Sequence, residues 1–510
     1  MDRRQFCKLG YTGILSSTII YNAAGAFESH SSNYAEPSAL RKQDSIAPNI
    51  LWICTDQQRY DTIGALGNKY IRTPNLDRLV KTGVAFNYAY CQSTICTPSR
   101  SSFLTGYYPR TVRGTKNGNL KWENAAPLIT KILSDYGYDC GLAGKLHLAS
   151  AKGRPEVRPD DGYRLFHSSL APLFRPGESE SNEYFDWMIS KGHDPEKLYA
   201  KNGYYPTDLH QTTWCTDKAI DFITEKREGP WLFSLNYFDP HPPLDPPKEY
   251  IDRFDIDSIP LPGFQESDLE DNEKLKDVYF QSTCSEPKGN KSRLKLAKYW
   301  AQVELIDDNL GRILETLEDT GQRNNTLIIY TSDHGNMVGH HGLTAKGCRF
   351  YEGLVRVPLI MSWPDMFLQD LISDALVELV DITPTLLDII GILPPNSGRP
   401  DVAMHGISLM DLLTGKSEPH VHREFTYSSY TKGLLNDESY GTMIRSKKYK
   451  LVNYHGSGWG QLFDMENDPG EFVNLWDKPE YQKIKYQLME KSYDYTVKII
   501  DTGSQYVARY

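Results

Sequence analysis

Three apolar, strand-like runs of this chain each end directly before side chains that bind cations or transfer protons. The runs cover residues 49–55, 231–237 and 326–331. The polar residues that follow them are Asp56 and Gln57, Asp239 and His241, and Asp333 and His334. Ligands of doubly wound sheets bind beyond the carboxyl ends of the strands, so these ends are expected to meet at one site. The two acid-plus-ligand pairs predict a cation site, although a single Asp after a strand also suits a turn or a helix cap.

Cys96 opens a segment, 96–106, that has the pattern of a short helix. Thr97 is expected to cap it, Pro98 suits the first helical position and Gly106 suits the end. Cys96 would then lie at a helix N-terminus, where amide groups favour negative charge. These residues alone leave two interpretations open, a nucleophilic cysteine and a buried structural one.

The order Cys96-Thr97-Pro98-Ser99-Arg100 resembles the Cys-x-Pro-Ser-Arg element of the type I sulfatases, in the alkaline phosphatase superfamily. Further elements of that family follow in the right order between about residues 49 and 475. They are Gly144-Lys145-Leu146-His147, Pro240-His241-x-Pro243, Thr331-Ser332-Asp333-His334-Gly335, Lys346, and the segments 384–388, 448–452 and 462–471. The resemblance implies that Cys96 is oxidised to formylglycine (3-oxoalanine), whose hydrate is the nucleophile.

The resemblance also implies a metal site. Its ligands would be Asp56, Gln57, Asp333, His334 and the modified Cys96. The usual ion in the family is Ca²⁺, which prefers hard oxygen ligands. Gln57 and His334 stand where many members carry Asp and Asn, so Mg²⁺ and Mn²⁺ stay open as alternatives.

The remaining catalytic roles come from the same resemblance. Arg100 would hold the nucleophile, while Lys145 and Lys346 would neutralise the sulfuryl oxygens. His241 would protonate the leaving alcohol, with Lys346 as a candidate for sharing that role, and His147 would take the proton that lets sulfate leave.

Two long polar segments, 150–218 and 265–292, are expected near the mouth of the site, where they would set specificity. The alternative is that both segments are solvent-exposed loops that bind no ligand. Arg110 and Arg113 are candidates for reading further anionic groups of a substrate, and Trp459 is a candidate for stacking on a sugar.

The elements that must position these residues are typical of an α/β fold. Short apolar runs alternate with helix-length segments, which predicts a large, mostly parallel or mixed central sheet with helices on both faces, like that of alkaline phosphatase. The resemblance adds a smaller C-terminal α+β subdomain with an antiparallel sheet. We expect a catalytic domain over 48–415 and the subdomain over 416–510.

The first residues are typical of an export signal. Arg3 and Arg4 precede a weakly apolar stretch and the small residues 24–26, an order that resembles the twin-arginine signal of bacteria. We expect a signal over 1–26 and a linker over 27–47; an uncleaved helical N-terminus is the alternative. No later run reaches the roughly 18 apolar residues of a membrane span, so no stable membrane insertion is expected.

Composition excludes several classes of protein. The 510 residues hold 56 Lys+Arg against 66 Asp+Glu, a net charge of −10, which disfavours nucleic acid as a partner. A hydrophobic share of 39% with 12% aromatics argues against disorder. Eight cysteines are too few for a disulfide framework.

We therefore expect an exported sulfatase, periplasmic or extracellular in a bacterium, that acts on a sulfated polysaccharide or oligosaccharide. Its other expected partners are a formylglycine-generating maturation enzyme and the export machinery. A phosphodiester or phosphonate monoester hydrolase of the same superfamily is the first alternative, which Pro98-Ser99-Arg100 disfavours. A noncatalytic glycan-binding protein is the second, and the presence of every implied catalytic residue speaks against it.

Overall fold

The fold is taken from a computed structural model that describes residues 47–122, 126–149, 156–171, 182–276, 278, 284–392, 403–433 and 438–500. Residues 46–510 form one compact unit. The expected export signal and most of the expected linker lie outside the described residues. No described helix combines the length and the apolar character that a bilayer crossing needs.

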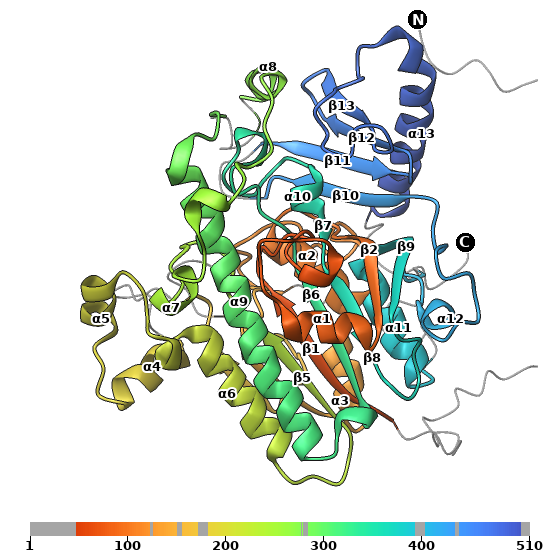
Figure 1. The fold of residues 1–510 in the computed structure, drawn as a ribbon. Coiled ribbons are helices and arrows are strands. Elements are labelled where there is room, and N and C mark those ends of the chain that lie inside the picture. The colour runs from red at the N-terminus through yellow and green to blue at the C-terminus, as the bar shows by residue number, and fades with distance from the viewer. Residues whose placement is uncertain are drawn as a thin grey trace, which may run out of the picture. The chain divides into compact units, whose positions relative to one another are not determined.

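A nine-stranded mixed sheet forms the centre of the molecule (Figure 1). Its order is β4-β3-β5-β1-β6-β8-β2-β7, with β9 paired to β2. The strands are β1 (Asn49–Thr55), β2 (Val84–Tyr90), β3 (Asp139–Gly144), β4 (Leu165–Ser168), β5 (Trp231–Asn236), β6 (Thr326–Ser332), β7 (Arg356–Val357), β8 (Leu359–Ser362) and β9 (Leu371–Glu378). The five strands from β4 to β6 run parallel, and β8 pairs antiparallel with β6. The expected α/β fold with a large mixed sheet is confirmed.

Helices cover both faces of this sheet. The helices of the described residues are α1 (Pro74–Lys81), α2 (Cys96–Thr105), α3 (Ile129–Asp135), α4 (Glu183–Ser190), α5 (Pro195–Asn202), α6 (Gln211–Thr224), α7 (Lys248–Ile251), α8 (Ser267–Lys274), α9 (Gly289–Asp319), α10 (Glu352–Val355), α11 (Ile382–Ile389), α12 (Met410–Leu413) and α13 (Gln482–Lys498).

Two hydrophobic cores follow from the strand alternation. In β1, Ile50 and Trp52 face the core that contains α2, α3 and α11, whereas Leu51 and Ile53 face the core that contains α1, α6 and α9. Side chains of a strand point alternately to opposite faces, so a strand that is apolar throughout requires cover on both sides. The apolar run that ends before Asp56 is therefore a central strand.

The C-terminal part is a four-stranded antiparallel sheet, as expected. It contains β10 (Thr426–Thr431), β11 (Tyr440–Arg445), β12 (Tyr449–Tyr454) and β13 (Trp459–Asp464), with α13 packed against it. Buried Lys450 of β12 contacts Glu352 of α10 at 3.1 Å and Glu471 at 2.6 Å. The pair with Glu352 connects the small sheet to α10, which follows the segment that carries Lys346.

The expected specificity segment 150–218 contributes more to the core than its polar sequence suggests. Its described residues include β4 at the sheet edge, α4, α5 and part of α6. Tyr184, Phe185 and Met188 of α4 belong to the core that contains α6 and α9. Figure 1 shows α4 and α5 beside α6, at the side of the molecule.

Candidate active site

The carboxyl ends of β1 and β6 bring two aspartates together. These strands are parallel neighbours with Thr55 opposite Ser332, so Asp56 and Asp333 leave the sheet side by side. The amide of Asp333 donates to the carbonyl of Thr55 at 3.1 Å. The end of β5 joins them, because the amide of Asp56 donates to the carbonyl of Asp239 at 3.2 Å.

Helix α2 places Cys96 over these strand ends. The Cys96 Sγ lies 3.6 Å from Asp56 Oδ1, 3.4 Å from His334 Nε2, 3.5 Å from Lys145 Nζ and 2.7 Å from Lys346 Nζ. Cys96 is itself the first residue of the helix and Ile95 is the N-cap. The expected cap by Thr97 is wrong, because its hydroxyl donates to the carbonyl of His147 at 2.8 Å.

Four donor side chains form a candidate metal centre. One ligand atom each from Asp56, Cys96, Asp333 and His334 lies within 4.8 Å of the others, and all four residues are buried. His334 Nδ1 lies 2.8 Å from the carbonyl of Gly335. A proton on Nδ1 for that hydrogen bond leaves the Nε2 lone pair free toward the cluster. Two carboxylates and an imidazole suit a divalent cation.

Gln57 lies beside this group in a left-handed backbone conformation, with φ of 68°. Its backbone amide donates to Asp333 Oδ1 at 3.2 Å. Its side-chain Oε1 accepts a short hydrogen bond from the side-chain amide of Asn336. The expected ligand is therefore adjacent to the cluster, with its amide oxygen held by Asn336.

Arg100 lies in the second turn of α2 and is buried. Its Nε donates to Asp333 Oδ2 at 2.9 Å, and its Nη1 donates to the carbonyl of Lys145 at 2.8 Å. Its Nη2 is buried and has no hydrogen-bond partner among the described residues. Because unpaired buried donors are costly, this atom points to an anionic group that the site is built to receive.

The site stabilises negative charge at the position of the Cys96 Sγ. Burial and the carboxylate of Asp56 oppose ionisation of the thiol, but Lys145 and Lys346 outweigh them and hold its pKa well below the usual range. An anionic oxygen at the same position would be stabilised by the same two ammonium groups.

The two aspartates have opposite pKa shifts. Burial opposes ionisation of Asp56, but the cationic groups around it, led by Lys145, lower its pKa well below the usual range. Lys145 Nζ makes a short ion pair with this carboxylate. Burial, aided by the charge of Asp56, raises the pKa of Asp333. A cation between the two carboxylates would relieve this repulsion.

The charged groups of the cluster shift the pKa values of His241 and His147. Burial lowers the pKa of His241 to about 3, and Lys346 and Lys145 lower it too, against the opposing effect of Asp56. Burial and Lys145 also lower the pKa of His147 well below its usual range. Both imidazoles are therefore neutral in the substrate-free site. The Nδ1 of His147 is buried and has no partner among the described residues.

The structure gives the surroundings of the three expected substrate residues, Arg110, Arg113 and Trp459. Arg110 lies near the C-terminal sheet, where its charge acts on Tyr427 and His455. Arg113 is exposed, with φ of 58°. Trp459 stacks on Tyr454 at a centroid distance of 6.3 Å, and Lys274 Nζ lies 5.1 Å from its ring centroid. Side chains of this chain, Tyr454 and Lys274, therefore contact the Trp459 ring.

Sequence reasoning missed Glu156. Its Oε2 accepts a hydrogen bond from the backbone amide of His147 at 2.9 Å. Its Oε1 accepts hydrogen bonds from the backbone amides of Leu148 at 2.9 Å and Ala149 at 2.7 Å. His147 has φ of 60°, in the left-handed region that is unfavourable for residues other than glycine. Three charge-assisted hydrogen bonds offset that cost, so Glu156 holds the segment that carries His147.

We expect Glu156→Gln to lower kcat by about tenfold with little change in KM, because the loss of one carboxylate oxygen frees the amide of His147. Steady-state kinetics on a small sulfate ester measure this. Glu273→Gln is the matched control, since Glu273 is an exposed carboxylate of α8 that pairs with Lys276. An unchanged kcat in Glu156→Gln would contradict a positioning role for this carboxylate.

Comparisons with known proteins agree with this geometry. Residues 48–392 match the family model "Sulfatase", and residues 339–498 match the model "N-sulphoglucosamine sulphohydrolase, C-terminal". The chain is 32% identical over 463 residues to an arylsulfatase of Clostridium perfringens, covering 86% of this chain and 92% of that protein. It is 27% identical over 517 residues to an N-acetylglucosamine-6-O-sulfatase of Bacteroides thetaiotaomicron, covering 88% and 86%.

A solved structure has the same fold. The phosphonate monoester hydrolase from Silicibacter pomeroyi superposes with a TM-score of 0.76 at 24% identity, covering 89% of this chain and 96% of that one.

Proposed function

Because the chain belongs to the sulfatase family of the alkaline phosphatase superfamily and is a sulfuric ester hydrolase, we propose that it desulfates a carbohydrate with a formylglycine made from Cys96. The observation that carries the proposal is the convergence of two ammonium groups, two carboxylates and His334 on the Cys96 Sγ. A sulfate ester needs such an arrangement, since its transition state places negative charge on oxygens around sulfur.

In this proposal three cations bind the sulfate group. Lys145 and Lys346 each have an ammonium group within 3.5 Å of the Cys96 Sγ. Arg100 adds its unpaired Nη2 from the second turn of α2. A formylglycine at position 96 supplies an aldehyde hydrate, whose one hydroxyl attacks sulfur and whose other hydroxyl later expels sulfate.

The metal centre would be filled by Asp56, Gln57, Asp333 and His334, with residue 96 as a further ligand. The oxygen ligands among them favour Ca²⁺. The imidazole of His334 leaves Mg²⁺ and Mn²⁺ as alternatives. A divalent cation held by these residues would supply Lewis-acid polarisation of a sulfate oxygen.

Two histidines handle protons in this proposal. His241 donates to the leaving alcohol, which requires that the anionic ester raise its pKa from the value of about 3 in the substrate-free site. Lys346 lies 2.7 Å from the Cys96 Sγ and is the candidate for sharing this step. His147 is neutral and has an unpaired Nδ1, so it suits the base that takes a proton when sulfate leaves.

The carbohydrate part of the proposal is supported by a relative, the N-acetylglucosamine-6-O-sulfatase of Bacteroides thetaiotaomicron. Export through the twin-arginine route, with a periplasmic or extracellular site of action, is supported by the sequence around Arg3 and Arg4. The partners would be the maturation enzyme that oxidises Cys96 and the export machinery.

A phosphodiester or phosphonate monoester hydrolase is the second candidate. Such substrates carry one negative charge on a tetrahedral centre, as sulfate monoesters do, so the cations around Cys96 do not separate the classes by charge. His334 favours this candidate, since an imidazole replaces the amide that many sulfatases carry there.

The kcat/KM values for a sulfate monoester, a phosphate diester and a phosphonate monoester with the same 4-nitrophenol leaving group separate the two candidates. We expect the sulfate ester to have the highest value. A panel of defined sulfated oligosaccharides then tests the sugar, with inorganic sulfate as the measured product. A higher value for either phosphorus ester, or sulfate release from the aryl ester alone, would contradict the proposal.

A further inference from the structure

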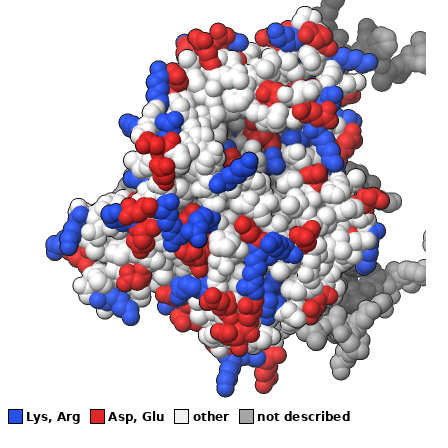
Figure 2. Space-filling model, in the orientation of Figure 1, with Lys and Arg blue, Asp and Glu red and all other residues white. Residues whose placement is uncertain are grey.

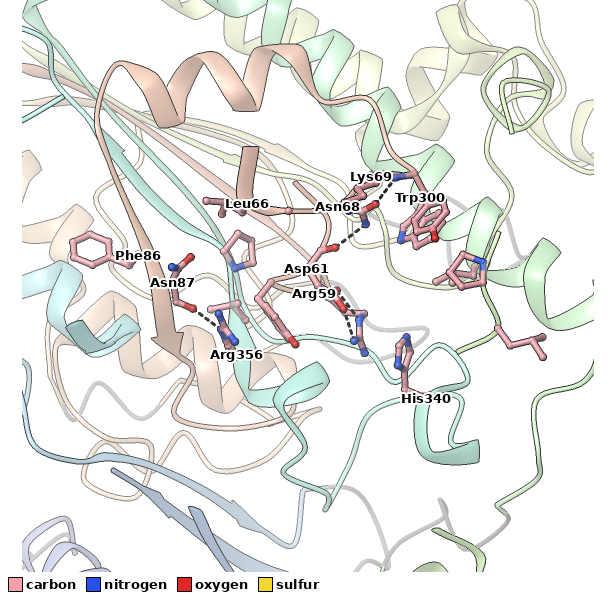
Figure 3. A pocket seen from close by; sticks show the side chains of 18 residues that line it. Arg59, Asp61, Leu66, Asn68, Lys69, Phe86, Asn87, Trp300, His340 and Arg356 are labelled. Carbon is pink, nitrogen blue, oxygen red and sulfur yellow. Dashed lines mark hydrogen bonds and ion pairs between the residues drawn. The ribbon is translucent and has the colours of Figure 1, made fainter. Parts of the chain in front are cut away.

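A second pocket, of about 360 Å³, lies beside the loop that follows β1 (Figure 3). Its walls come from that loop, β2, α9, the residues around β7, and the segments at Pro260 and His340. Among the described residues, its lining includes none of the candidate catalytic side chains. Leu66, Leu296 and Trp300 of its wall pack with the core of α1, α6 and α9, and Phe86 and Val357 pack with the core of α2, α3 and α11. Within the described part of the chain, no residue of the Cys96 cluster is part of the lining. The pocket is therefore separate from the Cys96 cluster.

Cations outnumber acids in its lining. Arg59, Lys69 and Arg356 face a single carboxylate, that of Asp61. Arg59 Nε and Nη2 donate to the two oxygens of Asp61 at 2.8 and 2.7 Å, so this pair is mutually neutralised. Lys69 and Arg356 then leave the pocket positive, although the protein as a whole carries a charge of −10. The face of the molecule in Figure 2 mixes both signs of charge, so a positive field at the pocket would be local.

Arg356 is held in place by its neighbours. Its guanidinium carbon lies 4.0 Å from the ring centroid of Tyr60 and 4.4 Å from that of Tyr88. Its Nη1 is 3.7 Å from Glu352, but Lys450 and Arg445 also contact that carboxylate, at 3.1 and 3.4 Å. Arg356, Arg445 and Lys450 meet two carboxylates there, those of Glu352 and Glu471, so this group of charges retains one excess positive charge. The Nε of Arg356 also donates to the carbonyl of Asn87.

An aromatic platform forms the other side of the pocket. Tyr70 is 47% exposed and stacks on Trp300, with ring centroids 5.7 Å apart and an interplanar angle of 7°. Figure 3 shows Trp300 beside Lys69, across the pocket from Arg356. Rigid aromatic faces next to fixed polar groups are the usual means of binding sugar rings.

We propose that this pocket is a second carbohydrate site, which binds an anionic sugar unit of the substrate chain at a position other than the ester being hydrolysed. The inference rests on the proposed carbohydrate substrate. A sugar there would stack on Tyr70 while its sulfate or carboxylate contacts Lys69, on the same side of the pocket, or Arg356, on the other side. The pocket would then raise the affinity for long chains and leave the chemistry at Cys96 unchanged.

The test uses the double variant Lys69→Ala/Tyr70→Ala, whose two side chains are exposed. The matched control is Lys226→Ala/Tyr136→Ala, a pair of exposed residues of the same types outside the pocket lining. Binding of dextran sulfate, carboxymethyl dextran and neutral dextran is measured by calorimetry in a Cys96→Ala background, which prevents turnover. Activity on 4-nitrophenyl sulfate is measured with both double variants in the active enzyme.

We expect the pocket variant to bind dextran sulfate about tenfold more weakly than the control, from the loss of one stacking face and one cation. Activity on 4-nitrophenyl sulfate is expected to stay unchanged in both variants. Loss of binding to carboxymethyl dextran as well would mean that the pocket recognises negative charge of either source. Equal affinity of the pocket variant and the control, equally tight binding of neutral dextran, or a parallel loss on 4-nitrophenyl sulfate would each overturn the proposal.

Failure of the proposed function gives a different result. An enzyme that released no sulfate from any sulfated sugar would refute the carbohydrate substrate, yet dextran sulfate binding would still report on the pocket.

Discussion

Replacement of Cys96 by alanine is expected to lower kcat for sulfate release by at least about 10⁴-fold. The cations and carboxylates of the site converge on the Sγ of this residue, so alanine leaves them without a nucleophile. Ion chromatography of released sulfate measures the loss, and thermal unfolding checks that the variant is folded. Sulfate release by Cys96→Ala at the rate of the unchanged enzyme would contradict the proposed nucleophile.

Two further variants sharpen this experiment. Cys96→Ser is expected to release alcohol once per enzyme molecule and then stop, because a serine ester has no second hydroxyl with which to expel sulfate. Cys91→Ala is the matched control, since Cys91 is a buried cysteine whose Sγ lies 3.7 Å from the carbonyl of Leu354, in the hydrophobic core. It is expected to keep kcat within about twofold while losing some stability.

Removal of the divalent cation is expected to have the second largest effect, a fall in kcat of about 10³-fold. Carboxylate oxygens of Asp56 and Asp333 lie within 4.8 Å of one another, and burial, aided by the charge of Asp56, raises the pKa of Asp333. An ion that binds only the folded protein also stabilises it, by about 2.7 kcal/mol when its concentration is 100 times Kd. Dialysis against a chelator, followed by return of Ca²⁺, Mg²⁺ or Mn²⁺, measures both the activity and the melting temperature.

A control variant distinguishes the loss of a metal ligand from the loss of any buried carboxylate. Asp307→Asn removes another buried carboxylate, one that accepts hydrogen bonds from the first amides of α1. This variant is expected to lose stability but to keep its response to the ion, whereas Asp333→Asn is expected to lose the response. A chelated enzyme with full activity would contradict the metal centre.

Much of the candidate site could be predicted from the sequence because its residues follow apolar strands. The runs before Asp56 and Asp333 are adjacent parallel strands, and the position of Cys96 at a helix start is confirmed.

Other features depend on contacts that no local pattern encodes. Thr97 resembled a helix cap, but its hydroxyl bonds to the carbonyl of His147, fifty residues away. Glu156 binds three amides from a loop whose conformation the sequence does not reveal. The second pocket joins residues from distant segments, and Lys274 of α8 reaches the ring of Trp459 from nearly two hundred residues away.

Mass spectrometry of the tryptic peptide 82–100 tests the central claim most directly, in protein produced together with a formylglycine-generating enzyme. This peptide contains Cys96 and also Cys91, which serves as an internal control. We expect a loss of about 18 Da at Cys96 relative to its thiol form, as oxidation to the aldehyde requires, with Cys91 unchanged. An active enzyme whose Cys96 is entirely an unmodified thiol would contradict the account.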